Sequence, residues 1–218
     1  GQIPDFSPEE LLHRIAKITY HWSDMLRDAL HVKYGEAEGE QIFLRYQHAF
    51  SQAYINNHDI KNAIYDIATV RRVIASGALG LELYRHENYE EKPVHLKFYH
   101  PDAQAALSDI LPMLENLGFR VIDENPFRVT PQGESKREIW IRDFHLEVPE
   151  NRDIDIKALK APLEEVLFRV WQGQLDNDGF NALALKAGLH WRQITLVRAL
   201  GAYARQAGLP YSLTAIQQ

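Results

Sequence analysis

The residues best suited to metal or acid–base chemistry in this sequence are its ten histidines. A zinc-binding helix of the His–Glu–x–x–His kind needs two histidines four residues apart, so that both imidazoles lie on one face. His13, His21 and His31 share one predicted helix, but they do not lie three or four residues apart, and no other pair has the required spacing. We therefore interpret the histidines as surface or half-buried side chains and predict no metal site.

The sequence lacks the motifs that nucleotide cofactors and acyl-transfer enzymes need. No Gly–x–Gly–x–x–Gly run follows a predicted strand, and neither a Walker loop nor a Gly–x–Ser–x–Gly elbow occurs. Cysteine is absent, which excludes a thiolate nucleophile, disulfides and Cys-ligated zinc. We predict no catalytic residue and no bound cofactor in this chain.

Two pairs of aspartates are close enough in sequence to suggest general acid–base chemistry. They are Asp153 with Asp155, and Asp176 with Asp178. A general acid–base pair needs a cleft and two different pKa values. Acidic residues beside Asn and Gly more often form turns and cap helices, and we interpret both pairs in that way.

One turn and the helix that follows it form the candidate ligand-binding site. Tyr99, His100 and Asp102 lie in the turn, and Ser108 and Asp109 open the helix. The first backbone N–H groups of a helix have no partner within the helix, so they can bind a carboxylate. The alternative is that Ser108 or Asp109 satisfies these N–H groups itself.

The spacing of the apolar residues divides the sequence into three parts. The period is helical over residues 7–76, alternates as in strands over 79–148, and is helical again from Asp155. We predict a helical segment at 1–77, an α+β module at 78–150 and a second helical segment at 151–218. The fold class is therefore α+β, a small antiparallel sheet with a packed helix, flanked by N-terminal and C-terminal helical segments.

The middle segment reads strand, strand, helix, strand, strand. The predicted strands cover 79–84, 94–99, 119–129 and 138–148, and the predicted helix covers 107–117. With Asp109 as N-cap, Pro112 would occupy the third helical position, where its missing N–H breaks no backbone bond. In the C-terminal segment we expect Trp171 and Trp191 to be core anchors that join the helices.

Length, charge and composition restrict the classes of function. The 218 residues suffice for one large domain or two small ones. A net charge of −6 argues against a nucleic-acid partner, and the apolar runs are too short to span a membrane. The lack of cysteine is compatible with a reducing compartment. Gly1 in place of Met, and a helix that would be cut short at Gln218, predict a piece of a longer protein.

Six blocks of sequence resemble the large bacterial NAD-specific glutamate dehydrogenases. They are Leu96–Pro101 (LKFYHP), Leu107–Glu124 (LSDILPMLENLGFRVIDE), Trp140–Phe144 (WIRDF), Val170–Gly173 (VWQG), Asn177–Asn181 (NDGFN) and Ala187–Arg192 (AGLHWR). The resemblance runs from about residue 7 to the end of the chain. It departs in the last helix, where Arg198–Tyr203 has fewer aromatic and basic residues than is usual in the family.

The resemblance places this chain upstream of the catalytic domain, with an ACT-like regulatory module at its centre. The family's nucleotide-binding glycines and catalytic lysine have no matching positions here. The resemblance implies a cytoplasmic parent that converts L-glutamate, NAD and water to 2-oxoglutarate, ammonia and NADH, while this chain alone is inactive.

The same resemblance implies the partners. They are the catalytic domain of the same chain, further copies of the parent in a homo-oligomer, and an amino-acid effector. The alternative function is that of a free-standing amino-acid-binding sensor of the ACT type.

Overall fold

The computed structural model describes residues 8–85, 94–101, 106–133, 137–149 and 154–208, with side chains from His21 onward. The helices before the sheet are α1 (Pro8–Tyr34), α2 (Glu36–Tyr46), α3 (Gln52–Asn57) and α4 (Ile60–Ser76). The strands are β1 (Gly80–Arg85), β2 (Val94–Pro101), β3 (Arg120–Val129) and β4 (Ile139–Glu147), with α5 (Leu107–Asn116) between β2 and β3. The last helices are α6 (Ile156–Trp171), the 3-10 turn η2 (Gly179–Ala182), α7 (Leu183–Ala187) and α8 (Trp191–Gln206).

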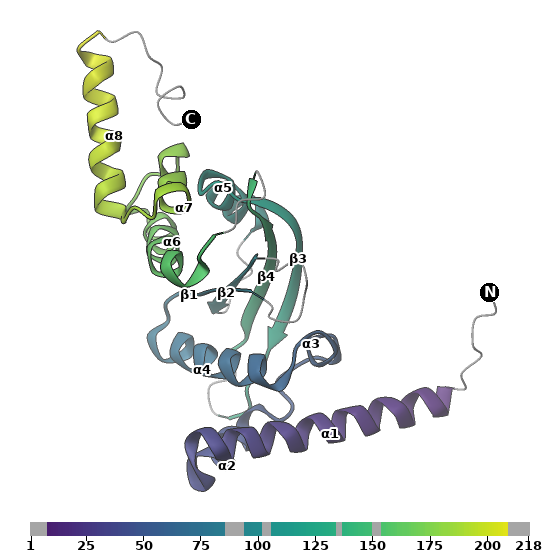
Figure 1. The fold of residues 1–218 in the computed structure, drawn as a ribbon. Helices are drawn as coiled ribbons and strands as arrows, with labels where there is room; N and C mark the ends of the chain where they lie inside the picture. The colour runs from purple at the N-terminus through teal and green to yellow at the C-terminus, as the bar shows by residue number, and fades with distance from the viewer. Residues whose placement is uncertain (1–7, 86–93, 102–105, 134–136, 150–153, 209–218) are drawn as a thin grey trace, which may run out of the picture. The chain divides into compact units, whose positions relative to one another are not determined.

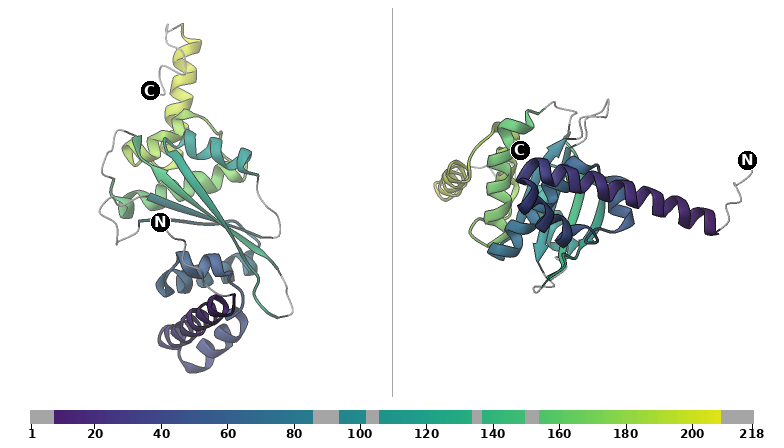
Figure 2. Two further views of the ribbon diagram at one scale, coloured as in Figure 1. Left: turned by 90° about the vertical axis from the view of Figure 1, so that its right-hand side faces the viewer. Right: turned by 90° about the horizontal axis from the view of Figure 1, so that it is seen from below.

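The four strands form one antiparallel sheet in the order β1-β2-β4-β3, which makes β1 and β3 the edge strands (Figures 1 and 2). The predicted α+β class, with helices before and after the sheet, is confirmed. All four predicted strands are present, with ends shifted by one or two residues. The division into three segments at 77/78 and 150/151 stays a prediction.

The described residues form two compact units, each with its own hydrophobic core. The first unit draws on Gly1–Ala78, Tyr99–Asp102 and Phe127–Ile141, and the second draws on Leu79–Phe98, Ala103–Pro126 and Arg142–Gln218. The two sets of core side chains have no member in common.

In the first unit, helices α1 to α4 pack with the ends of three strands. Its core includes the buried residues Leu26, Leu30, Phe43, Tyr54, Ile67, Val70, Phe127, Val129, Ile139 and Ile141. Asp59 caps α4 by accepting a hydrogen bond from the backbone N–H of Asn62, and Gly77 ends that helix in the left-handed conformation. Helix α3 was not predicted as a separate helix; it has six residues, and its N-cap is Ser51.

A buried carboxylate lies inside this first core. Asp66 of α4 is 1% exposed, and both of its oxygens accept hydrogen bonds from tyrosines. Tyr54 of α3 donates to Oδ2, and Tyr99 of β2 donates to Oδ1 at 2.7 Å. Since a buried charge is costly unless it is hydrogen-bonded, the two phenols make this position tolerable for an aspartate.

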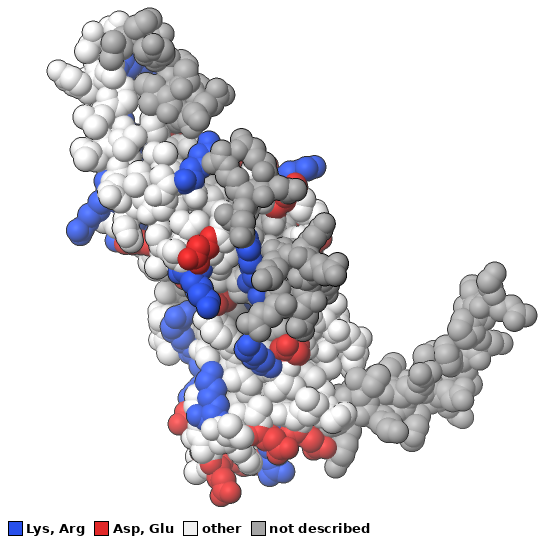
Figure 3. All heavy atoms as spheres, in the orientation of Figure 1, with Lys and Arg blue, Asp and Glu red and all other residues white. Residues whose placement is uncertain are grey.

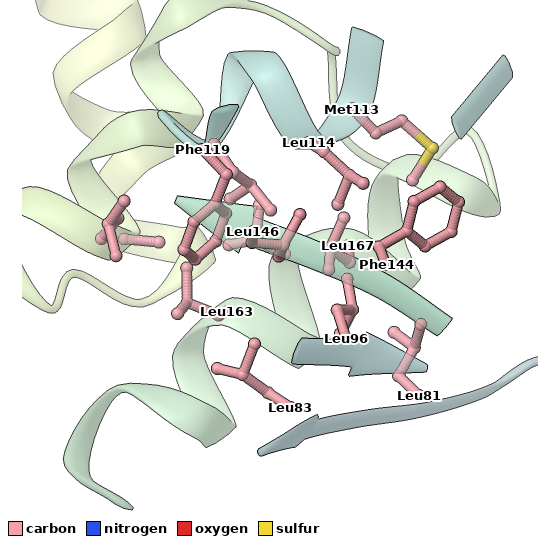
Figure 4. Packing of buried hydrophobic residues seen from close by; sticks show 14 of the residues in the cluster. Leu81, Leu83, Leu96, Met113, Leu114, Phe119, Phe144, Leu146, Leu163 and Leu167 are labelled. Atoms are coloured by element: carbon pink, nitrogen blue, oxygen red, sulfur yellow. The ribbon is translucent and has the colours of Figure 1, made fainter. Parts of the chain in front are cut away.

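In the second unit, α5 and α6 cover one face of the sheet. Figure 4 shows Leu83, Leu96, Phe144 and Leu146 of the strands facing Leu114 of α5 and Leu163 and Leu167 of α6. These side chains are all at most 2% exposed. Helix α6 also binds the edge strand β1, because Glu164 Oε1 accepts the backbone N–H of Leu83 at 2.9 Å and Lys160 pairs with Glu82.

Helix α5 begins at Leu107, and its N-cap lies three residues before the predicted cap Asp109. Its N-cap is Ala106, so Asp109 lies in the first turn and is not the cap. Pro112 is therefore the sixth helical residue, and the carbonyl of Ser108 loses its backbone partner. The prediction that Pro112 occupies the third helical position was therefore wrong. It relied on the general preference of Asp for N-cap positions, whereas the helix starts before Asp109.

An ion pair connects α8 to the 3-10 turn η2. Arg198 of α8 donates to both carboxylate oxygens of Asp178, at 2.7 and 2.9 Å, and Asp178 in turn caps η2. Trp171 and Trp191 are partly buried and pack against the margin of the core, and the guanidinium of Arg169 on α6 lies 3.8 Å from the ring centroid of Trp191. Their role as core anchors stays a prediction. Phe180 and Ile194 are fully buried in the same core.

Gly39 sets the closest approach of α1 and α2, and we predict that Gly39→Ala destabilises the chain. A Cβ at this buried position would lie 2.8 Å from the carbonyl oxygen of Leu30. Alanine ordinarily stabilises a helix interior by about 1 kcal/mol over glycine, whereas overpacking costs about 1–3 kcal/mol. Denaturant melts should show a net loss. The control is Ala37→Gly in the exposed part of α2, and a gain in stability for Gly39→Ala would contradict the close contact.

Tyr46 gives a second stability prediction. Its side chain is 1% exposed, and its hydroxyl has no hydrogen-bond partner among the described residues. Burial raises the pKa of Tyr46 to about 12. The neutral phenol is thus favoured by folding, so its contribution is complete below pH 10 and is lost as the pH rises toward 12.

We expect Tyr46→Phe to remove this alkaline loss and to raise the free energy of unfolding at neutral pH by about 1 kcal/mol, because an unpaired buried hydroxyl disappears. Melts from pH 7 to 11 measure both effects. Equal alkaline losses in the two proteins would show that Tyr46 is not the group responsible.

Candidate functional site

The structure places the predicted ligand residues in two different units. Tyr99 is fully buried in the first unit, where its hydroxyl donates to Asp66, and the neighbouring His100 is half-buried. Ser108 and Asp109 are exposed on the first turn of α5 in the second unit. Asp102 lies outside the described residues. A ligand site made of these five residues stays a prediction.

The start of α5 also decides between the two readings of its free N–H groups. The N-cap is Ala106, which has no polar side chain, and neither Ser108 nor Asp109 caps the helix. The expected alternative of a self-capped helix was therefore wrong for these two residues. Asp109 still lies in the first turn, where a carboxylate interacts favourably with the helix dipole.

A different set of polar residues gathers in the second unit, and we call it the sheet-face cluster. It consists of Tyr84, His95, Lys97, Asp143 and His145. They occupy alternate positions of β1, β2 and β4, next to core residues of the same strands. Because successive side chains of a strand point to opposite faces, the cluster lies on the face away from α5 and α6.

Asp143 is the centre of the sheet-face cluster. Its Oδ2 accepts a hydrogen bond from the Tyr84 hydroxyl at 2.7 Å, and its Oδ1 lies 3.2 Å from Nδ1 of His95. The Nζ of Lys97 lies 5.2 Å from the centroid of the Tyr84 ring, within the range of a cation–π contact. One carboxylate therefore fixes a phenol and an imidazole, and the phenol ring faces a cation.

Two imidazoles stack at the margin of the cluster. The rings of His95 and His145 are 5.2 Å apart and nearly parallel, with an angle of 6° between their planes. Nδ1 of His145 lies 3.3 Å from Oδ2 of Asp123 on β3, so each imidazole has its own carboxylate. The contacts thus link all four strands across one face of the sheet.

Burial makes this cluster unusual for a sheet surface. Lys97 is 2% exposed and Asp143 is 6% exposed. Lysine and aspartate are almost never so buried unless they are paired, and breaking a buried charged network leaves an uncompensated charge. The cluster offers hydrogen-bonding and charged groups, but within the described residues no group of three His, Cys, Asp or Glu side chains is arranged to hold a metal ion.

Sequence reasoning did not find the sheet-face cluster, although a signal was present. His95 and Lys97 alternate with Leu96 and Phe98, as Asp143 and His145 alternate with Phe144. An alternating polar face is normally solvated, so alternation alone does not distinguish a surface from a buried network. The contact between His95 and Asp143 joins residues 48 positions apart, which no local pattern reveals.

Three family models match this chain in the order of its elements. "Glutamate dehydrogenase, helical motif 2" matches residues 29–73, "Glutamate dehydrogenase, ACT3 domain" matches residues 78–159, and "Glutamate dehydrogenase, helical motif 3" matches residues 175–218. The ACT3 match contains the whole sheet, and the two helical motifs lie on either side of it in the sequence.

Curated relatives named NAD-specific glutamate dehydrogenase match most of the chain. The protein from Halomonas elongata is 34% identical over 207 residues, which is 94% of this chain and 13% of the relative. The protein from Pseudomonas aeruginosa is 32% identical over 96% of this chain and 13% of the relative. The protein from Mycobacterium tuberculosis is 33% identical over 90% of this chain and 12% of the relative. The chain therefore spans about one-eighth of the length of these relatives.

A helix needs about 20 predominantly apolar residues to cross a bilayer. None of the helices in the described part of the chain is both long and apolar enough to do so.

We predict that Tyr84→Phe lowers the free energy of unfolding by about 1.5–3 kcal/mol, because the substitution deletes a hydrogen bond to a buried carboxylate. The ring that faces Lys97 is retained. Chemical denaturation measures the loss. The matched control is Tyr203→Phe, at a side chain that is 70% exposed, which should change stability by less than about 0.5 kcal/mol. Equal effects at the two positions would contradict the role given to Asp143.

Proposed function

We propose a regulatory and assembly function for this chain, which is related over its length to one region of the NAD-specific glutamate dehydrogenases. The observation that carries the proposal is the match of an ACT3 domain to residues 78–159, between matches to helical motifs 2 and 3. In this proposal the parent polypeptide oxidises L-glutamate to 2-oxoglutarate and ammonia with NAD in the cytoplasm. The chain described here contributes no reacting group.

The arrangement of the sheet supports the proposal that this module transmits a regulatory signal and does not catalyse a reaction. One face of the sheet packs on α5 and α6, and the other carries the sheet-face cluster, in which Asp143 joins Tyr84 and His95. A hydrogen-bonded network of this kind holds its strands in one arrangement. A shift of one strand therefore displaces the strands bonded to it, and a regulatory element requires such coupling.

The proposed partners follow from the same relationship. They are the catalytic domain of the same polypeptide, other copies of the parent in a homo-oligomer, and an amino-acid effector. The effector is tested on the purified parent by measuring glutamate oxidation with each amino acid added in turn. A change in rate that disappears when the ACT3 region is deleted supports a regulatory site there, and an unchanged rate with all of them contradicts it.

The central test compares the natural protein with the 218-residue chain. An antibody raised against this chain should detect a natural polypeptide several times larger than 25.2 kDa, as the coverage of its relatives implies. That polypeptide, once purified, should reduce NAD in the presence of glutamate. A natural protein of only about 25 kDa would favour the free-standing amino-acid sensor.

We predict that the 218-residue chain alone forms no NADH from glutamate and NAD, because its sequence contains no Gly–x–Gly–x–x–Gly loop for the dinucleotide. NADH absorbance is followed with the natural polypeptide as positive control and buffer as blank. Turnover above the blank that survives repurification would contradict the assignment of catalysis to another part of the parent.

A further inference from the structure

Helix α8 carries a second apolar face that is exposed among the described residues of its unit. Leu196, Leu200 and Tyr203 are spaced at i, i+4 and i+7, which places them on one side of the helix. Their exposed fractions are 60%, 58% and 70%. We call these three residues the α8 stripe. No other helix in the described part of the chain presents three large apolar side chains with this exposure.

The α8 stripe is distinct from the face by which α8 packs in the second unit. Ile194 is fully buried in the core of that unit, and Arg198 is bound by Asp178. At 100° per residue, Ile194 lies roughly opposite the stripe on the helix. A helix with apolar residues on two opposite sides is suited to lie between two layers, and the described residues of the second unit supply one of them.

The charge of α8 indicates what kind of surface could cover the stripe. The helix contains three arginines and no acidic residue. Asp178 already pairs with Arg198, whereas Arg192 is exposed beside the stripe. In Figure 3 the described surface of α8, at the upper left, is mostly white, the colour of residues other than Lys, Arg, Asp and Glu. A complementary partner therefore combines apolar side chains with carboxylates at their rim.

We propose that the α8 stripe docks onto an apolar surface edged by carboxylates in the catalytic region of the same polypeptide. This inference rests on the proposed function. Helical motif 3 includes α8, and about seven-eighths of each relative lies outside the matched region, so the parent contains ample chain to cover the stripe. A second copy of this chain offers no carboxylate from its own α8 to pair with Arg192 beside the stripe, because α8 contains no acidic residue.

The test measures amide hydrogen exchange of α8 in two contexts, the 218-residue chain and the natural parent polypeptide. We expect the α8 amides to exchange at least about tenfold more slowly in the parent, because docking suppresses local opening. The double variant Leu196→Lys/Leu200→Lys should abolish this difference and leave exchange in the 218-residue chain unchanged. The matched control is Leu44→Lys on α2, a leucine that is 53% exposed, which should preserve the protection of α8.

Three results would overturn the inference. They are equal exchange of α8 in both contexts, full protection retained by the double variant, and a 218-residue chain that sediments as a dimer which the double variant dissociates. The last result identifies a second copy as the occupant. Circular dichroism confirms that each variant is folded. A parent that oxidises glutamate but leaves α8 unprotected contradicts only this inference, whereas a natural protein without that activity contradicts the proposed function.

Discussion

The register of two strands determines the rest of this structure. On β2, Leu96 and Phe98 belong to the core of the second unit, and Tyr99 belongs to the core of the first. On β4, Phe144 belongs to the core of the second unit, and Ile141 belongs to the core of the first. Since side chains alternate along a strand, a slip of one residue would exchange apolar and polar positions on both strands. The same register brings Asp143 to Tyr84 and His95, so the cores and the polar network are specified together.

Much of the fold could be predicted from the sequence because its strands and long helices have clear apolar periods. The ends of the predicted strands lie within two residues of the observed ends. The N-cap of α5 and the short helix α3 were not predicted, because a few residues of local preference compete poorly with tertiary packing. Periodicity gives the side of a helix on which Trp171 lies, but it does not give the depth of burial, and this side chain is only partly buried.

The candidate site was the least predictable part. The expectation concentrated on a turn and a helix start, whereas the structure shows Tyr99 engaged by Asp66 and assembles a polar cluster from residues on separate strands. Helix α8 illustrates how one element can serve two purposes. One side is fixed to its unit through Ile194 and Arg198, and the α8 stripe on the other side is available for a larger assembly.

The two tyrosines that donate hydrogen bonds to Asp66 also affect when the first unit can fold during translation. Tyr54 comes from the neighbouring helix, but Tyr99 lies 33 residues further along the chain. Until β2 has left the ribosome, the N-terminal helices contain a carboxylate with only one of its two tyrosine donors, and their core lacks the strand residues up to Ile141. A nascent chain would therefore acquire its first stable unit late, after most of the sheet has been translated, and a truncation after α4 would release a helical segment prone to proteolysis.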